Sequence, residues 1–250
     1  MKKYKIETHC HSVYSFDSNT AIESIVQGCL SKGLDFLILN DHDRCGITPE
    51  DEALFAKKGI QVLKAIEFTT KEGAHIIGIH PHIKALEQKA FHYSVREIID
   101  SLGSMEAFII IPHPCHETGL LGQEKVSPAD RSHALSLAHF IETDNFRYGT
   151  TKDMAKIQAE YPLLRLIIGS DAHNSSDIGA YQNVFPAPAG LSDPINALYN
   201  AESIEFLRTK KHGRGYWQIR KLKKSGLYQG LLKLFPADLR RKIKNALLRR

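Results

Sequence analysis

Short apolar runs alternate with amphipathic stretches along most of the chain. Short continuous apolar runs predict buried strands, and apolar residues spaced by a helical turn predict helices. The predicted strands cover residues 5–8, 35–40, 61–68, 74–79, 107–112, 139–143 and 166–169. The predicted helices cover residues 21–31, 49–58, 95–102, 128–137 and 151–159. The segment 186–190, which contains two prolines, predicts a loop.

The alternation of strands and helices predicts an α/β fold. Apolar strands linked through helices are typically parallel and covered on both faces. With about seven such strands, a closed or nearly closed barrel is favoured over an open sheet, and 250 residues suffice for one such domain. The strand ends of such a barrel form a rim where functional groups gather.

Composition agrees with a folded protein that has a sizeable core. The chain is 42% hydrophobic and 24% charged, which excludes a compositionally disordered protein. It has no apolar run long enough to cross a bilayer and no apolar leader after Met1, so we expect a cytoplasmic protein. The four cysteines form no Cys-x-x-Cys pair. Cys10 and Cys115 neighbour histidines, and we interpret them as reduced residues without a role in catalysis rather than as ligands or nucleophiles.

Charge is divided unevenly along the chain. Residues 208–250 carry 15 of the 33 Lys and Arg residues and one acidic residue, a net charge of +14, whereas residues 1–207 carry −9. We therefore predict a barrel domain over 1–207 and a basic amphipathic helical extension over 208–250. Residues 213–250 are a candidate contact with anionic membrane, through peripheral association, or with nucleic acid. The alternative is that their apolar stripes pack on the barrel and their charges are solvated.

Residues that can bind a metal follow nearly every predicted strand. They are His9, His11 and Asp17; Asp41, His42 and Asp43; Glu67; His75; His113; Glu142; and Asp171 and His173. A buried carboxylate such as that of Glu67 is costly unless it is paired or bound to metal. Any one of these residues alone is explained by an ordinary hydrogen bond at a strand end, but their convergence on one rim predicts a metal centre.

The ligand types indicate which metals this centre would bind. His9 and His11 are one residue apart on an extended strand, so both imidazoles project from the same side and can grip one ion. Imidazole and carboxylate ligands suit manganese, iron or zinc, and the lack of thiolates argues against a structural zinc site. The ligands are too many for one ion, so we predict two or three divalent ions with a bridging carboxylate. Such a cluster activates water and clamps phosphoryl oxygens.

This ordered set of residues resembles the PHP (polymerase and histidinol phosphatase) superfamily. The motifs that carry the resemblance are Thr8-His-Cys-His11, Asn40-Asp-His-Asp43 and Gly169-Ser-Asp-Ala-His173, and it covers roughly residues 4–185. The resemblance implies a distorted (β/α)7 TIM-like barrel with a three-metal centre at its C-terminal rim. It also implies a stand-alone phosphoesterase, in which a metal-bridging hydroxide attacks phosphorus and no side-chain nucleophile is needed.

The resemblance also assigns the ligands. It places the first ion on His9, His11, Asp171 and the bridging Glu67, the second on Glu67, His75 and His113, and the third on Asp17, His42 and His173. Asp41 and Asp43 would orient His42. Asn40 replaces the usual threonine of its motif. Glu142 and Asn145 match a Glu-x-x-Asn stretch whose contact with metal stays open.

The substrate is less well determined than the metal centre. Only 37 residues separate His75 from His113, which leaves little room for a capping domain and predicts an open site. We expect a phosphomonoester of a nucleotide or other small phosphorylated molecule. The alternatives are a nuclease for short or single-stranded nucleic acid and a non-catalytic phosphate-binding module. Candidate phosphate contacts are Arg44, His80, His82 and His116, although each of them is better explained as an ordinary rim residue. No general acid and no oligomeric state are predicted.

Overall fold

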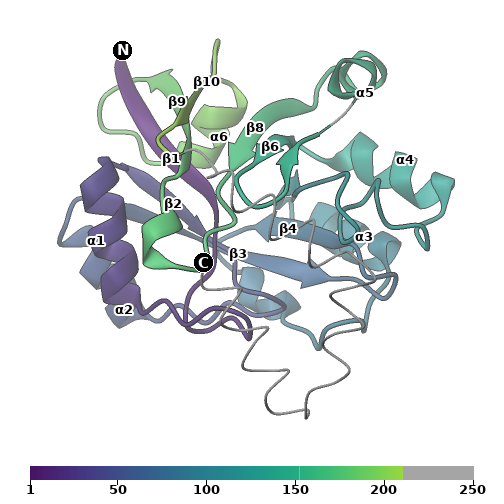
Figure 1. Cartoon of the computed structure of the whole chain (residues 1–250), viewed down its shortest axis with the longest axis horizontal. Coiled ribbons are helices and arrows are strands. Elements are labelled where there is room, and N and C mark those ends of the chain that lie inside the picture. Colours follow the sequence, from purple (N-terminus) through teal and green to yellow (C-terminus); the bar gives the residue numbers. More distant parts are fainter. Residues whose placement is uncertain (152, 211–250) are drawn as a thin grey trace, which may run out of the picture. The chain divides into compact units, whose positions relative to one another are not determined.

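The computed structural model describes residues 1–151 and 153–210, which form one compact unit built around a curled sheet (Figure 1). The strands of the described residues are β1 (Lys2–Cys10), β2 (Phe36–Leu39), β3 (Gln61–Thr69), β4 (His75–Ile79), β5 (Phe108–Ile111), β6 (Phe140–Asn145), β7 (Gly149–Thr150), β8 (Arg165–Gly169), β9 (Tyr181–Ala187) and β10 (Glu205–Arg208). The helices are α1 (Ile22–Lys32), α2 (Pro49–Ala56), α3 (Val95–Ser104), α4 (Pro128–Leu137), α5 (Met154–Glu160) and α6 (Pro194–Tyr199), with short 3₁₀ turns η1 (Ile83–Leu86) and η2 (Ser175–Asp177).

The sheet order is β10-β9-β1-β2-β3-β4-β5-β6-β7, and β8 pairs with β6. This confirms the predicted α/β fold class. It corrects the expectation of parallel strands throughout, because β4 is antiparallel to both β3 and β5, and β9 is antiparallel to β1. The chain between β3 and β4 is too short for a crossover helix, which a parallel pair needs. Instead Thr70 and Ala74 close a tight hairpin through their backbones, with Gly73 at φ +89°.

The hairpin determines which end of β4 reaches the rim. Thr69, the last residue of β3, pairs with His75, the first residue of β4. The start of β4 therefore lies beside the end of β3, and His75 lies at the same edge of the sheet as Glu67.

An isolated backbone bridge between Cys10 and Ala172, together with several side chains, links β8 and the residues after it to the β1–β9 side of the sheet in place of a continuous ladder. The amide group of Asn183, on β9, accepts a hydrogen bond from Ile168 N (2.9 Å) and donates one to Ile168 O (2.8 Å). Thr8, on β1, also donates its hydroxyl to Ile168 O at 2.9 Å. These contacts curl the sheet so that β1 and β8 bring their carboxyl ends together.

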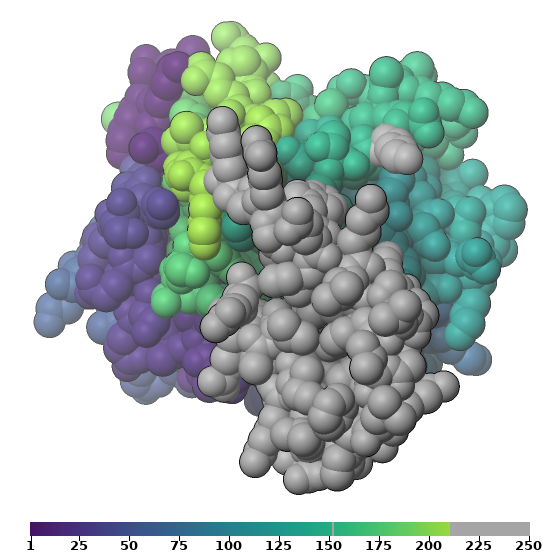
Figure 2. Space-filling view, viewed as in Figure 1, coloured from purple at the N-terminus to yellow at the C-terminus, as the bar shows by residue number. Residues whose placement is uncertain are grey.

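The sheet is covered on both faces, as its apolar strands predict. In β2, Phe36 and Ile38 belong to an inner cluster with residues of α6, whereas Leu37 and Leu39 belong to an outer cluster with residues of α1 to α4. In the view of Figure 2, residues of the first quarter of the chain (purple and blue) form one flank and residues near 100–160 (teal) form the other. Successive side chains of a strand point to opposite faces, so both faces are apolar.

The predicted strands and helices are all present, with ends displaced by a few residues. The strands β7, β9 and β10 and the helix α6 lie outside the predicted set. Pro186 and Ala187 belong to β9 rather than to the predicted loop. Pro186 pairs with Lys3 of β1 on one side of β9. On the other side, β10 pairs with β9 only as far as Val184, so Pro186 faces no strand there that would need its missing N–H.

Among the described residues, no helix has the length and apolar character needed to cross a membrane. The compact unit extends to Lys210, and Thr209 N donates to Ala180 O at 2.8 Å. The predicted basic helical extension lies outside the described residues from 211 onward, so the predicted domain division stays a prediction.

Candidate metal centre

One edge of the sheet, where most strands end, gathers all nine predicted metal ligands. His9 lies near the end of β1, and His11 and Asp17 follow that strand; His42 follows β2; Glu67 lies near the end of β3 and His75 begins β4; His113 follows β5; and Asp171 and His173 follow β8. The structure therefore brings together, from six strands, residues that are up to 164 positions apart in the sequence.

Glu67 occupies the middle of this group. Its side chain is 1% exposed, and its two oxygens face the ring nitrogens of five histidines. Oε1 lies 2.9 Å from His75 Nδ1 and 3.1 Å from His113 Nε2, and Oε2 lies 3.1 Å from the Nε2 atoms of His9 and His11 and 3.6 Å from His42 Nε2. A carboxylate whose two oxygens face separate sets of imidazoles has the arrangement that a bridging ligand requires.

Asp171 is the second carboxylate at the floor of the centre. Its Oδ1 lies 3.2 Å from His173 Nδ1, 3.4 Å from His11 Nε2 and 3.7 Å from His9 Nε2. The guanidinium of Arg147 is 3.9 Å from the same oxygen. Asp171 and its neighbours therefore concentrate both charge signs within a few ångströms.

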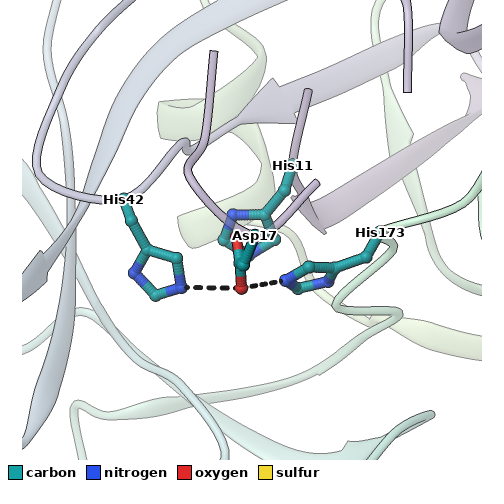
Figure 3. A group of neighbouring side chains, drawn as sticks. All are labelled: His11, Asp17, His42 and His173. Atoms are coloured by element: carbon teal, nitrogen blue, oxygen red, sulfur yellow. Dashed lines mark hydrogen bonds and ion pairs between the residues drawn. The ribbon is translucent and has the colours of Figure 1, made fainter. Parts of the chain in front are cut away.

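Asp17 joins two histidines at the outer side of the centre (Figure 3). Its Oδ2 lies between the rings of His42 and His173, 3.6 Å from Nε2 of the first and 2.6 Å from Nε2 of the second. The ring of His11 lies beside both, with centroids 4.8 Å from His42 and 4.3 Å from His173. One donor atom from each of these four residues lies within 4.8 Å of the others, close enough to hold one ion.

The described donors fall into four overlapping groups. They are His11, Asp17, His42 and His173; His9, His11 and Glu67; His9, His113 and Asp171; and His42, Glu67 and His75. Asp17, His42 and His173, which the resemblance assigns to the third ion, fall in one group, and His11 belongs to the same group. His113 groups with His9 and Asp171, and His75 groups with His42, although both also contact Glu67. The division of the nine residues among three ions stays a prediction.

Unpartnered nitrogen atoms indicate that these residues fit a metal. Among the described residues, four of the seven buried side-chain atoms without a hydrogen bond are ring nitrogens of predicted ligands: both of His11, Nδ1 of His42 and Nδ1 of His113. Buried polar atoms nearly always have a partner. His11 Nε2 approaches carboxylate oxygens without the alignment of a hydrogen bond, as expected of atoms directed at a shared ion. Imidazole and carboxylate donors suit divalent transition metals, and no cysteine joins any described donor group.

The electrostatics of the centre also favour cations. Burial alone would raise the pKa of the Glu67 carboxyl, but the imidazoles of His9, His42 and His75 hold it well below its usual range. The pKa of Asp171 is likewise held low, against burial, by His9 and by Arg147. These carboxylates therefore stay ionised and attract positive charge.

The histidines respond to the same field in two ways. For His11, burial opposes protonation, but Asp171 and Glu67 outweigh it and raise the pKa to about 9. For His42, burial dominates and lowers the pKa to about 3, with His11 and His75 acting in the same direction. Protons on some imidazoles thus balance the carboxylates, and a divalent cation that binds there displaces them.

Glu142 supports the centre from behind His9. Its Oε1 lies 2.8 Å from His9 Nδ1, and its Oε2 accepts hydrogen bonds from His113 N (2.7 Å) and Asn145 Nδ2 (2.8 Å). Glu142 is fully buried and belongs to none of the donor groups. The contact fixes the ring so that Nε2 of His9 faces Glu67.

Glu7 is a supporting residue that the sequence analysis missed. It is fully buried on β1 and accepts hydrogen bonds from the backbone N–H groups of His9, Ser170 and Gly179 and from the Ser170 hydroxyl. Burial raises the pKa of its carboxyl to about 7, although the hydrogen bonds from Ser170 oppose this. The only signal in the sequence was an acidic residue within a predicted strand, between Ile6 and Thr8.

Asp41 and Asp43 do not orient His42, contrary to the prediction. Asp41 accepts hydrogen bonds from the backbone N–H (2.6 Å) and hydroxyl (2.8 Å) of Ser12, and Asp43 accepts one from Thr69 N at 2.7 Å. Nδ1 of the His42 ring has no hydrogen-bond partner, so neither aspartate contacts it. The two aspartates therefore tie the His42 loop to the segment after β1 and to the end of β3.

Asn40, at the position where the resemblance implies a threonine, has a comparable structural role. Its side chain accepts a hydrogen bond from Cys10 N at 2.8 Å and donates one to Thr8 O at 3.4 Å. The amide thus clamps the end of β1, on which the first two histidine ligands depend.

The candidate phosphate contacts are mostly remote from the centre. His80 and His82 follow the far end of β4 and so lie at the opposite edge of the sheet, because β4 is antiparallel to its neighbours. Arg44 is exposed and does not line the cleft described below. His116 is close, since its ring stacks on Tyr148 with centroids 3.8 Å apart. Of the four, only His116 stays a candidate.

The centre forms the floor of an open cleft of about 250 Å³. Its lining includes seven of the nine predicted ligands, together with Phe16, Thr69, Ala90, Phe91, Thr118 and Tyr148. His9 and His11 lie beneath, fully buried. The sequence analysis missed the aromatic residues, and the only signal for any of them was that Phe16 directly precedes Asp17.

Two solved structures share this fold at low sequence identity. A two-domain protein of Bacteroides vulgatus containing a predicted PHP-like metal-dependent phosphoesterase matches with a TM-score of 0.64 and 18% identity over 83% of this chain and 65% of that one. Endonuclease Q, solved with a 27-mer duplex that has an abasic lesion at the active site, matches with a TM-score of 0.63 and 17% identity over 82% of this chain and 58% of that one.

Sequence comparison adds a relative and a family. A 5′-3′ exoribonuclease of Haemophilus influenzae is 33% identical over 95 residues, which cover 35% of this chain. The chain thus matches about a third (34%) of the length of this curated relative. The model of the PHP domain family matches residues 7–173, which span the centre from β1 to His173. The chain therefore belongs to the PHP domain family.

Proposed function

We propose that the protein is a metal-dependent phosphoesterase that hydrolyses a phosphomonoester of a nucleotide or other small phosphorylated molecule. The observation that carries the proposal is the set of nine imidazole and carboxylate side chains around the buried Glu67, at the floor of an open cleft. Membership of the PHP domain family supports it.

The charges of the cleft explain why the reaction would depend on metal. Asp17, Glu67 and Asp171 are held ionised, and their negative charge would repel a phosphate dianion. Divalent manganese, iron or zinc ions, held by the nine ligands, would lower the pKa of water and neutralise phosphate oxygens. The protein contributes the positions of its ligands, which Glu142, Glu7 and Asn40 hold from outside the donor groups.

The experiment combines elemental analysis with phosphate release from a panel of phosphomonoesters. The variant is His9→Ala/His11→Ala, which we expect to lose metal and hydrolysis together. A matched control is His80→Ala/His82→Ala, because this second His-x-His pair lies at the opposite edge of the sheet. Full metal content in the first variant, or inactivity of the metal-loaded protein on every ester, would contradict the proposal.

A nuclease is the second candidate, favoured by the identity shared with the exoribonuclease of Haemophilus influenzae. It predicts cleavage of single-stranded oligonucleotides that is faster than hydrolysis of mononucleotides. If residues 213–250 bind the single-stranded nucleic acid, the rate of cleavage should fall steeply as the salt concentration rises. Replacing Arg240, Arg241, Lys242 and Lys244 with Gln should make this dependence on salt less steep. Equal salt dependence in the variant would remove the proposed role of these residues.

A further inference from the structure

Two phenylalanines at the cleft are exposed in a way that burial in the core does not explain. Phe16 is 80% exposed and Phe91 is 60% exposed, and both line the cleft above the metal ligands. No other phenylalanine in the described part of the chain is exposed. Ligand-binding clefts typically combine aromatic side chains in their lining with a few convergent polar groups.

Both rings are held at the cleft by the surrounding structure. Phe16 lies between Ser15 and Asp17 in the chain, and the hydroxyl of Ser15 accepts a hydrogen bond from His42 N at 3.2 Å. The ring of Phe16 packs on the ring of His42, with centroids 5.0 Å apart. Phe91 has a φ of +64°, which is strained for a bulky side chain, and its N–H donates to Thr69 O at 2.8 Å. Such strain persists only where the surroundings impose it, and it is common at ligand sites.

The cleft thus has two parts with different chemistry. Its floor collects cations and so suits a phosphate, whereas its rim offers aromatic rings. A sugar phosphate would use only the floor. A nucleotide would use both, because its base presents a flat π-face on which an aromatic side chain can stack, whichever base it is.

We propose that Phe16 and Phe91 stack on the base of a nucleoside monophosphate whose phosphate lies at the metal centre. The proposal rests on the proposed phosphoesterase function and narrows its substrate class to nucleotides. Tyr148, stacked on His116, lines the same cleft and adds a third ring to its wall. A stacked base contributes about 1–3 kcal/mol, which converts to about 5- to 150-fold in kcat/KM.

The experiment compares adenosine 5′-monophosphate with ribose 5-phosphate, which carries the same phosphoester without a base. The full metal-loaded chain is assayed as wild type, Phe16→Ala, Phe91→Ala and Phe91→Tyr. We expect each alanine variant to lower the ratio of kcat/KM for adenosine 5′-monophosphate to kcat/KM for ribose 5-phosphate by about 5- to 150-fold. Phe91→Tyr keeps an aromatic ring and should retain the wild-type ratio. Using the ratio removes any change that Phe16→Ala transmits to the adjacent ligand.

Tyr93 provides a matched control, and adenosine binding provides a second measurement. Tyr93 is 42% exposed in the same loop as Phe91 but does not line the cleft, so Tyr93→Ala should leave the ratio unchanged. Equilibrium dialysis of adenosine, which has no phosphate, should show weaker binding to both phenylalanine-to-alanine variants.

The outcomes separate this inference from the proposed function. Hydrolysis of both esters with an unchanged ratio in both alanine variants overturns the inference and leaves the phosphoesterase standing. Failure to hydrolyse either ester, with adenosine binding that falls in the variants, overturns the reaction and supports the ring site. Absence of both hydrolysis and adenosine binding overturns both.

Discussion

Replacing Glu142 with Gln should weaken metal binding without removing any ligand. The two oxygens of Glu142 face three nitrogen atoms: His9 Nδ1, His113 N and Asn145 Nδ2. If His9 held an ion through Nε2, its Nδ1 would carry the proton, and all three nitrogens would donate to Glu142. Glutamine has one acceptor oxygen and one NH₂ group, so at least one of the three donors would face another donor and lose its hydrogen bond.

The geometry indicates which contact would fail. The amide oxygen would stay with His113 N and Asn145, because there it accepts two hydrogen bonds, and the NH₂ group would face His9 Nδ1. His9 would then change tautomer, placing a proton on the nitrogen that faces Glu67. Loss of such an orienting carboxylate costs about 10- to 100-fold in metal affinity, which is about 1.4–2.8 kcal/mol.

The assay is competition of the protein with a chelator for manganese or zinc, together with phosphate release at saturating metal. Asp144→Asn is a matched control on the same strand, because Asp144 pairs with Arg208 at 2.8 Å and joins no donor group. We expect the control to bind metal as the wild type does. Wild-type metal affinity in Glu142→Gln would refute the orienting role.

Three further predictions concern packing, metal and pH. Gly169→Ala should lower metal content by elemental analysis, because its Cβ would overlap the Glu142 carboxylate and lie 2.9 Å from His9 Cβ, whereas Gly103→Ala has open space and should not. Chelation should lower the thermal unfolding midpoint, since ions at 100 times their Kd add about 2.7 kcal/mol; an unchanged midpoint would contradict the metal site. Burial lowers the pKa of His139, whose Nδ1 accepts a hydrogen bond from Ile109 N at 3.2 Å, so its neutral form favours the fold. Stability from His139 is therefore present above about pH 6.5 and lost below it, and chelated wild type should lose more stability than chelated His139→Gln between pH 7.5 and 5.5; equal losses would argue against this.

The fold and the gathering of ligands were predictable because both depend on local pattern. An apolar strand followed by His, Asp or Glu places that residue at a rim in any parallel α/β barrel, so His9, His42 and His113 needed no knowledge of tertiary contacts. His75 reached the same rim for a different reason. It starts its strand, and only the reversed direction of β4 brings it to Glu67.

The partners of individual polar side chains could not be predicted in the same way. Asp41 and Asp43 flank His42 in sequence, yet their side chains bind Ser12 and Thr69. Such contacts depend on which loops lie next to each other in the fold, and the hydrophobic periodicity of the sequence does not predict this. The aromatic rim escaped prediction for the same reason, because Phe91 comes to the cleft through a loop with an unusual backbone conformation.

Backbone strain is concentrated where the chain turns into the centre. Among the described residues, six non-glycine residues have positive φ, and three of them, Asp43 (59°), His113 (29°) and Asp171 (51°), lie at or beside the predicted ligands. Each such residue costs about 1–3 kcal/mol. Part of this cost is offset by the hydrogen bonds that Asp43 accepts from Thr69 N and that His113 N donates to Glu142. These hydrogen bonds hold the strained turns at the positions from which the predicted ligands reach Glu67.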